Sequence, residues 1–556
     1  MAARLAPPSF NDRADPGHPR YGHQNGAGDF SHALMRGLML LALLLGLFAL
    51  AGCGEKGPPF AIVAGSENKV LEPIVQEFCA DRGAECTVHY SGSLDIGLAI
   101  ASTGGIEADA VWPASSVWID LFDTGRKVKH VTSIAQMPVI LGVRKSKAEE
   151  LGWVGRDVFM EDILAAVENG SLRFLMTSAT QSNSGASAYL AMLSSALGGK
   201  AVIEPGDLDK PDVRKTVQTL LRGVERSSGS SGWLAELYIK SAREGTVFDA
   251  MWNYEAVLKE TNDELRTMGN EPLYAIYPAD GVAIADSPLG FVERGRGDKV
   301  ETFFNDLLAY LQSDAVKARI AATGRRIPLS AGGVTATPEP DWNFDPTRLV
   351  TSIRMPEPPV IRQALNLYQG ALRKPSLTAL CLDFSGSMEG VGVTQLKGAM
   401  QFLFSPEKAS EVLVQWSPED RILVLPFDGG VRARLTASGS DDDQRRLLAS
   451  VLKENANDGT DMYRCAREAL ASIAATPDRD KYLPAIVILT DGRSDGDADG
   501  FLAAWRKVRP PVPVFGITFG DADKAQLDAL AAATAARVFK GQDNLAGAFR
   551  AARGYN

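Results

Sequence analysis

Short apolar runs alternate with amphipathic stretches over the last third of the chain. An apolar run such as 379–382, which ends in polar residues, is typical of a parallel strand that is buried on both faces. Apolar residues at helical spacing, as in 462–474, predict amphipathic helices. This alternation predicts an α/β domain whose parallel sheet is covered on both faces. The predicted strands are 378–383, 421–427, 485–489 and 512–519, and the predicted helices are 393–403, 442–453, 462–474, 500–508, 524–536 and 544–552.

Oxygen-bearing side chains stand where two of these strands end. Asp383, Ser385 and Ser387 form an Asp-x-Ser-x-Ser run after the first strand, Thr460 precedes a helix, and Asp491 follows the third strand. Strand ends of open α/β sheets are where ligand sites form. Two carboxylates and three hydroxyls are hard oxygen ligands that suit Mg²⁺ or Mn²⁺, and the set contains no sulfur or imidazole.

These five residues, in this order and within this alternation, resemble the metal-ion-dependent adhesion site of von Willebrand factor type A (VWA) domains. The resemblance covers roughly residues 376–556, a length typical of one domain. It implies that the two serine hydroxyls contact a divalent cation directly (Mg²⁺, or else Mn²⁺ or Ca²⁺). Thr460 and the two carboxylates then complete the shell, directly or through water. One open coordination position implies a protein partner that supplies an Asp or Glu carboxylate.

An uninterrupted apolar run, Gly37–Ala51, follows Arg36 near the start of the chain. A basic residue, a short apolar core and small residues before a cleavage site are typical of a secretory signal peptide. An uncleaved anchor helix is the alternative, although the run is short for one. The ending Leu50–Cys53 resembles the bacterial lipobox, which implies that Cys53 is acylated and begins the mature protein. We expect residues 1–52 to be a signal region with Met35 as the true start, and a lipid anchor at the cell envelope, facing the periplasm or the exterior.

Cysteine usage agrees with export. Cys79 closes a predicted helix and Cys86 opens the next strand, so a disulfide between them is expected in an oxidising compartment. A metal site that adds His89 is the alternative, but it has no fourth ligand nearby. Cys381 and Cys465 lie inside a strand and a helix, where buried free thiols are the default expectation.

The segment 59–337 is too long for a linker and has enough apolar runs to fold as a domain. Strands that end in Ser- and Gly-rich turns before helices recur through it, as after 60–64 and 86–90. Such turns place hydroxyls and free backbone N–H groups at helix N-termini, where anions bind readily.

This segment resembles the type II periplasmic solute-binding proteins, nearest to the molybdate and phosphate binders. The resemblance implies two lobes with a cleft for a small solute. The turn at Ser182 carries no arginine, which argues against a strongly charged oxyanion, and Trp112, Trp252 and Tyr254 offer stacking surfaces for an organic solute instead. Helix capping is the alternative role for each serine. The resemblance suggests these cleft-lining residues: Ser66, Ser93, Trp112, Ser182, Asn183, Ser184, Tyr254 and Asp280.

Residues 338–375 are Pro-rich and contain a helix-like stretch at 361–372, which indicates a stiff bridge between two domains. The fold class expected for the whole chain is therefore α/β, with a two-lobed periplasmic-binding-protein-like domain followed by a Rossmann-like VWA domain. The formal net charge of −10 includes no basic patch with aromatics, so nucleic-acid binding is not expected. We expect no enzyme either, because the sequence offers no Ser/His/Asp or Cys/His arrangement and no P-loop lysine.

Three classes of function follow from these features. The leading one is a lipid-anchored receptor or adaptor that presents a metal site to a protein partner and a cleft to a small solute. The second is the substrate-binding component of a transport system, in which the VWA domain docks onto a permease. The third is a chelatase-type subunit that works with an ATPase, and export argues against it because ATP is not available outside the membrane.

Overall fold

The computed structural model describes residues 56–328, 332–491, 493–519, 524–541 and 544–554. The predicted signal region, with Met35 and Cys53, lies outside these residues. Residues from Gly57 onward form one compact unit. No helix within the described part of the chain is long and apolar enough to span a bilayer.

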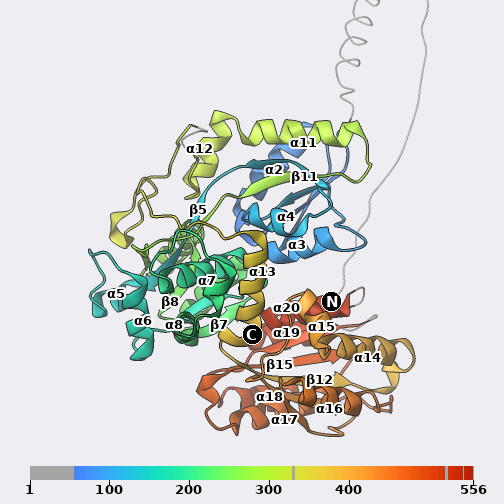
Figure 1. The fold of residues 1–556 in the computed structure, drawn as a ribbon. Helices are drawn as coiled ribbons and strands as arrows, with labels where there is room; N and C mark the ends of the chain where they lie inside the picture. The colour runs from blue at the N-terminus through green and yellow to red at the C-terminus, as the bar shows by residue number, and fades with distance from the viewer. Residues whose placement is uncertain (1–55, 329–331, 492, 520–523, 542–543, 555–556) are drawn as a thin grey trace, which may run out of the picture. The chain divides into compact units, whose positions relative to one another are not determined.

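The first lobe is built on a five-stranded sheet in the order β2-β1-β3-β11-β4. Alternate residues of β1 face opposite sides, so Phe60 and Ile62 join one apolar cluster and Val63 packs against another. Helices α2 and α11 cover the first face, and α3 and α4 cover the second (Figure 1). The elements are β1 (Phe60–Gly65), η1 (Ser66–Leu71), α2 (Glu72–Asp81), β2 (Cys86–Ser91), α3 (Ser93–Ala101), β3 (Ala110–Trp112), α4 (Val117–Phe122), β4 (Val128–Ser133), β11 (Pro288–Val292), α11 (Asp298–Leu311) and α12 (Asp314–Ala322).

The second lobe is built on a sheet in the order β10-β5-β8-β6-β7, with β9 paired to β5. Its helix α7 is buried on nearly all sides, so its sequence shows little helical periodicity. The chain crosses between the lobes at the start of β5 and again after β10. The elements are β5 (Met137–Arg144), α5 (Lys145–Glu150), α6 (Met160–Glu168), β6 (Phe174–Thr177), α7 (Asn183–Ala196), η2 (Pro205–Asp209), α8 (Pro211–Arg222), β7 (Val224–Ser228), α9 (Ser231–Arg243), β8 (Ala250–Tyr254), α10 (Glu255–Thr267), β9 (Leu273–Ile276) and β10 (Ile284–Ala285).

The Pro-rich bridge packs onto the second lobe along its length. Trp342 and Phe344 stack with ring centroids 4.8 Å apart and join that lobe's apolar core, as do Ile361 and Leu365. The bridge contains η4 (Pro340–Trp342), α13 (Pro358–Leu367) and η5 (Tyr368–Leu372). Burial of these side chains, rather than proline stiffness alone, holds the bridge in place.

The C-terminal domain is a six-stranded sheet in the order β14-β13-β12-β15-β16-β17, parallel except for the edge strand β14. Alternate residues of β12 join different cores: Leu380 and Leu382 pack with α14, α16 and α20, whereas Ala379 and Cys381 pack with α17, α18 and α19 (Figure 1). The elements are β12 (Ser376–Asp383), η6 (Gly386–Met388), α14 (Val391–Leu403), α15 (Pro406–Glu411), β13 (Arg421–Phe427), β14 (Leu435–Ser438), α16 (Asp441–Val451), α17 (Met462–Ala474), η7 (Arg479–Lys481), β15 (Leu483–Thr490), α18 (Ala498–Trp505), β16 (Val514–Thr518), α19 (Lys524–Ala533), β17 (Val538–Lys540) and α20 (Leu545–Gly554).

The α/β fold class is confirmed, but the sheet is not wholly parallel as predicted. Two short edge strands, β14 and β17, and the six-residue helix α15 are not among the predicted elements. Edge strands are half exposed and short, so their residues carry neither a continuous apolar run nor a clear alternation. The predicted ranges for β13 and α17 coincide with the structure.

Candidate functional site

The carboxyl ends of β12 and β15 lie side by side, because the two strands pair in parallel with Leu382 opposite Leu489. Asp383, the last residue of β12, is fully buried. Its Oδ1 accepts the backbone N–H of Ser385 at 2.8 Å and its Oδ2 accepts the hydroxyl of Thr490. Asp383 is therefore held in one orientation at the floor of the loop that follows the strand.

The next residues of the same loop connect this floor to β15. The hydroxyls of Ser385 and Ser387 lie 3.1 Å apart, and the Ser387 hydroxyl donates to Oδ1 of Asp491 at 2.8 Å. Asp383, Ser385, Ser387 and Asp491 thus form one connected cluster of oxygen atoms from two strand ends. The structure brings together four of the five predicted metal ligands.

Thr460 belongs to a loop that lies against this cluster. Asn457 donates its backbone N–H to the carbonyl of Phe384 at 2.8 Å and forms a bridge with Ser385. The carbonyl of Thr460 accepts the N–H of Asp495 at 3.4 Å. No hydrogen bond joins the Thr460 hydroxyl to the four clustered side chains, all of which the structure describes. Metal binding by all five residues stays a prediction.

The electrostatics of the cluster fit a bound cation. Burial raises the pKa of Asp383, hydrogen bonds from Ser385 and Thr490 oppose the rise, and the neighbouring Asp491 carboxylate adds to it. Two carboxylates held this close destabilise each other's charged forms, and a divalent cation removes that cost. The described residues contain no group of three or more His, Cys, Asp or Glu side chains placed to hold a metal. Serine hydroxyls must therefore supply part of any shell here, and hard cations accept such ligands.

A disulfide lies directly behind the cluster. Cys381 of β12 and Cys465 of α17 are bonded across a sequence separation of 84, with Cα atoms 6.0 Å apart. The expectation of two buried free thiols is therefore wrong. Both residues point from adjacent elements into the same buried layer, which spacing along the chain cannot reveal. The expected pair Cys79 and Cys86 is also in disulfide geometry, with Cα atoms 6.1 Å apart.

Most of the predicted cleft serines bond to protein groups instead of facing open space. The Ser93 hydroxyl accepts the N–H of Ala114 at 3.0 Å. The hydroxyls of Ser182 and Ser184 lie 3.3 Å apart, and Thr177 lies 2.8 Å from the second of them. All of these side chains are buried. Of the predicted residues only Ser66 lines the described pocket where the two lobes meet the C-terminal domain.

The predicted aromatic residues are buried and bonded to protein groups. The Trp112 indole donates to the hydroxyl of Ser287 at 3.0 Å, and Asn183 donates to the Tyr254 hydroxyl at 3.1 Å. Trp112, Tyr254 and Trp252 are almost completely buried. Trp112 packs in the core of the first lobe and Trp252 in that of the second, whereas Asn183, the partner of Tyr254, also accepts the indole N–H of Trp118 from the first lobe at 2.8 Å. Stacking of these rings on an organic solute stays a prediction.

Asp280 lies apart from the other predicted cleft residues. Its carboxylate accepts the N–H of Met160 at 3.1 Å, at the start of α6, and it lines a surface pocket of the second lobe with Phe159. Its placement in the cleft is wrong, because the Pro-Ala-Asp-Gly turn that contains it folds against α6 instead of returning to the other lobe.

Several residues that connect the two lobes are not among the predicted cleft residues. Glu67 and Arg325 are buried, and Ser231 donates its hydroxyl to Glu67 at 3.2 Å. Glu67 follows Ser66 in a Gly-Ser-Glu-Asn turn. An acidic residue next to a predicted cleft serine is the sequence feature that could have identified Glu67. Arg325 could not be found from sequence, because its partners are far away along the chain.

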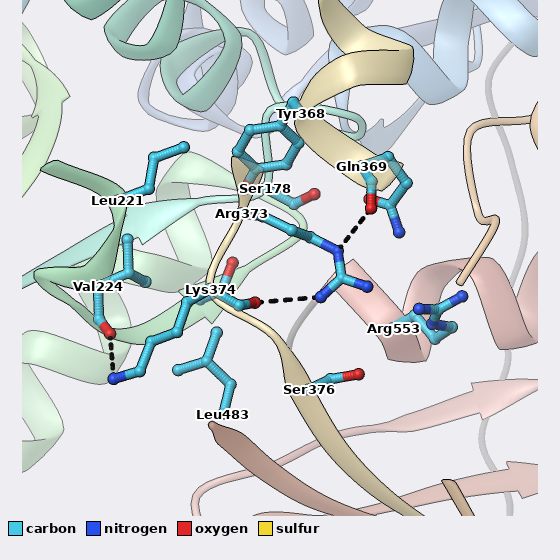
Figure 2. Close-up of a pocket in the computed structure, with 11 residues that line it drawn as sticks. Ser178, Leu221, Val224, Tyr368, Gln369, Arg373, Lys374, Ser376, Leu483 and Arg553 are labelled. Atoms are coloured by element: carbon cyan, nitrogen blue, oxygen red, sulfur yellow. Dashed lines mark hydrogen bonds between the residues drawn. The ribbon is translucent and has the colours of Figure 1, made fainter. Parts of the chain in front are cut away.

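One cavity lies at these contacts, and another lies between the second lobe, the bridge and the C-terminal domain. One of about 350 Å³ is lined by Ser66, Asp95, Ser230 and Arg537 among other residues. The other, of about 30 Å³, has room for little more than ordered water. Figure 2 shows its lining, with the Lys374 amine directed to the Val224 carbonyl, a 3.1 Å hydrogen bond.

Two family models match separate parts of the chain. Residues 61–326 match bacterial extracellular solute-binding proteins, and residues 379–548 match the von Willebrand factor type A domain. The chain therefore carries a solute-binding protein domain followed by a VWA domain. No curated protein matches the sequence.

Solved structures show weaker likenesses. A periplasmic binding protein is 16% identical, with 53% of this chain and 92% of that chain covered and a TM-score of 0.39. A von Willebrand factor type A protein from Catenulispora acidiphila is 18% identical, with 34% and 44% covered and a TM-score of 0.28. The sulfate-binding protein of Mycobacterium tuberculosis is 15% identical, with 50% and 88% covered and a TM-score of 0.37. At such TM-scores these likenesses add nothing to the two family matches.

Proposed function

We propose that this protein is a binding protein of the cell envelope, in which a divalent-metal site on the VWA domain captures a carboxylate of a protein partner. The observation that carries the proposal is the connected cluster of Asp383, Ser385, Ser387 and Asp491 at two adjacent strand ends. Its chemistry is that of a hard-cation site with few formal charges. We propose no catalytic step.

Each residue of the cluster has a distinct role in this proposal. Asp383, Ser385, Ser387, Thr460 and Asp491 would hold Mg²⁺, or else Mn²⁺ or Ca²⁺. The bound ion would supply a partly neutralised positive charge that attracts an incoming Asp or Glu carboxylate. Ser385 orients Asp383 through its N–H, and Ser387 ties the β12 loop to Asp491.

Direct metal binding tests the site before any partner is known. Manganese binding, followed by electron paramagnetic resonance of the free ion, is expected to show one site per chain. Asp383→Asn removes a ligand charge and is expected to weaken binding by at least roughly tenfold. Asp442→Asn is the matched control, because it removes one exposed carboxylate on α16 that pairs with Arg445. Equal manganese affinity of the two variants would exclude this site.

Partner capture tests the proposed role of the metal. Envelope proteins captured by wild-type protein are expected to be lost in EDTA or with Asp383→Ala, while the melting temperature changes little because apolar strands build the sheet. Ser387→Ala is expected to weaken capture less, since water can replace a neutral ligand. A partner that binds equally well in EDTA contradicts the mechanism even though the VWA domain is present.

We also propose that acylated Cys53 anchors the protein at the membrane. This rests on the Leu50–Cys53 pattern after the apolar run. Cys53→Ser is expected to leave an uncleaved precursor, because the thiol that receives the lipid is absent. An intact mass that shows an unmodified Cys53 within a longer mature chain is the contrary result.

The solute-binding protein domain supports a second proposed role, the capture of a small solute. A ligand would enter the pocket of about 350 Å³ beside Ser66 and Ser230. The alternative function, a transport component whose VWA domain docks onto a permease, rests on the same domain match. Solute uptake by a reconstituted permease tests this alternative. If the protein stimulates uptake and the Asp383→Ala variant does so equally, the result favours a transport role that does not need the metal site. If the variant no longer stimulates uptake, both roles depend on the metal site.

A further inference from the structure

A cavity of about 710 Å³ lies where helix α8 of the second lobe, the bridge and the C-terminal domain meet. Helix α8 supplies Gln218 and Arg222, the bridge supplies residues 372–375, and the C-terminal domain supplies residues at the starts of β13 and β15 and at the end of β14. Within the described part of the chain, this cavity shares no residue with the pocket beside Ser66 or with the metal site. It is therefore separate from both sites of the proposed function.

Lys374 carries a buried positive charge at this cavity. The residue is 8% exposed, and its amine makes one hydrogen bond within the described residues, to the carbonyl of Val224 at 3.1 Å (Figure 2). An ammonium group can donate three hydrogen bonds, and a buried charge without an anionic partner costs free energy. Burial accordingly lowers the pKa of Lys374 to about 8, Arg173 lowers it further, and Glu225 and Asp480 oppose this. The amine therefore retains the capacity to bond an anion.

The neighbouring Arg373 already has its partners within the protein. Its guanidinium donates to the carboxylate of Asp420, and to the carbonyls of Gln369 and Lys374 at 3.2 and 3.1 Å. Asp420 also accepts the N–H and the hydroxyl of Ser376, at 2.7 and 3.0 Å. Arg373 and Asp420 therefore neutralise each other and form part of the wall of the cavity.

Two arginines at the rim have no acidic partner. Arg222 of α8 and Arg421 of β13 are exposed, and neither forms an ion pair with a residue that the structure describes. Arg421 lies over the ring of Tyr482, with its guanidinium carbon 5.0 Å from the ring centroid. The rim therefore presents two positive charges, one of them on an aromatic ring.

The charges of the lining favour an anion overall. Five cations and three acids line the cavity, and one of the acids, Asp420, is neutralised by Arg373. The other two, Glu419 and Asp480, are exposed, so solvent and salt screen their charges. Lys374 is buried, and its attraction for an anion is screened much less.

Apolar surface lines the same cavity. Leu372, Pro375 and Pro418 contribute aliphatic carbon, and Tyr482 contributes an aromatic ring. Cavities that bind small organic molecules combine such surface with a few polar groups. An inorganic anion leaves this surface without a partner, whereas an aromatic ring packs well on tyrosine and on guanidinium groups.

We propose that this cavity binds a small organic anion, whose charged group contacts Lys374 and whose aromatic or other apolar body lies against Tyr482 and the two prolines. Such a ligand contacts the second lobe, the bridge and the C-terminal domain at once, so its binding stabilises their contact. The inference goes beyond the proposed function and does not depend on it. It needs neither a bound metal nor a solute between the lobes.

The fluorescent dye anilinonaphthalene sulfonate (ANS) is the probe, because it joins an anionic group to aromatic rings. Titration of the full chain is expected to show saturable binding with a dissociation constant on the order of 0.1 mM or below. Lys374→Met removes the buried charge and keeps a long side chain, and it is expected to weaken binding at least roughly tenfold. Arg222→Gln is expected to weaken binding roughly two- to fivefold, because its charge is exposed. Arg434→Gln, which removes an exposed arginine paired with Glu468 outside the cavity, is the matched control and is expected to bind as the wild type does.

Two related compounds test the class of ligand. Phenylnaphthylamine has the rings of ANS without the sulfonate, and it is expected to bind at least roughly tenfold more weakly. Sulfate has the charge without the rings, and its displacement of ANS is expected to need roughly a hundredfold higher concentration than that of the dye. Equal binding of the uncharged dye, or displacement by sulfate at concentrations comparable to that of ANS, overturns the proposal.

The variants can also overturn it. Folded wild-type protein that binds no ANS contradicts the proposal, and so does ANS binding that is unchanged in both Lys374→Met and Arg222→Gln, because the dye then lies elsewhere. If Lys374→Met does not fold, the double variant Arg222→Gln/Arg421→Gln carries the same test, since both arginines are exposed. It is expected to bind ANS roughly tenfold more weakly, and wild-type affinity in this variant is the contrary result.

Discussion

The disulfide between Cys381 and Cys465 makes a strong prediction for the VWA domain. It closes a loop with a sequence separation of 84. In the chain-entropy model, cross-linking a loop of this length reduces the entropy of the unfolded chain enough to stabilise the fold by about 4–5 kcal/mol. For a domain of this size such a loss lowers the melting temperature by on the order of 10 °C.

Urea unfolding of the double variant Cys381→Ala/Cys465→Ala measures this contribution. The double variant of Cys79 and Cys86 is the matched control, because that bond closes a loop with a separation of only 7 and the same model assigns it about 2–3 kcal/mol. We expect the first variant to lose clearly more free energy of unfolding than the second. Equal losses, or free labelling of Cys381 and Cys465 in denatured non-reduced protein, would refute the reasoning.

The same bond has a consequence for the metal site. Cys381 lies two residues before Asp383 on β12, and Cys465 lies in the first turn of α17, just after Thr460. The disulfide therefore fixes the distance between the two segments that carry these ligands. Because groups that orient ligands commonly change metal affinity by roughly 10–100-fold, we expect the double variant of Cys381 and Cys465 to bind manganese at least about tenfold more weakly. Unchanged affinity would show that the loops are positioned without it.

Two further predictions concern buried carboxylates. Burial raises the pKa of Glu67 from its ordinary 4.5 to about 7, opposed by Ser231 and Arg325 and increased slightly by Glu260. The folded state therefore holds an extra proton between these values, and stability of the solute-binding domain should fall by up to about 3 kcal/mol as pH rises from 4.5 through 7. Glu67→Gln should remove that part of the pH dependence in thermal melts, and an identical slope would contradict it. Asp420 is fully buried and paired with Arg373, so Asp420→Asn should cost about 3–5 kcal/mol in urea unfolding, and a loss below about 1 kcal/mol would show that the pair is dispensable.

Much of the VWA domain could be read from the chain because its signals are local. The continuous apolar run of β13 and the helical periodicity of α17 predict those elements with their observed ends. The order of Asp383, Ser385, Ser387 and Asp491 predicts a shared site, because parallel strands bring their carboxyl ends to one edge of the sheet. Four of the five residues lie together for that reason.

The solute-binding domain was harder to read at the level of its cleft. A serine at the start of a helix looks the same whether it caps the helix, bonds to the other lobe or faces a solute. Ser93, Ser182 and Ser184 bond to protein groups in the structure, and Asp280 caps a helix elsewhere. Sequence alone does not separate these roles, because all of them require the same small polar side chain.

The sequence by itself determined the two α/β domains, their order, the bridge between them and the set of oxygen ligands at the strand ends. These features depend on hydrophobic periodicity and on residues close together in the chain. Only the tertiary structure decided that Cys381 meets Cys465 and that Glu67 meets Ser231 and Arg325. Such pairs form between segments whose meeting depends on how whole sheets and helices pack, and the free energy of that packing comes from many distant residues together.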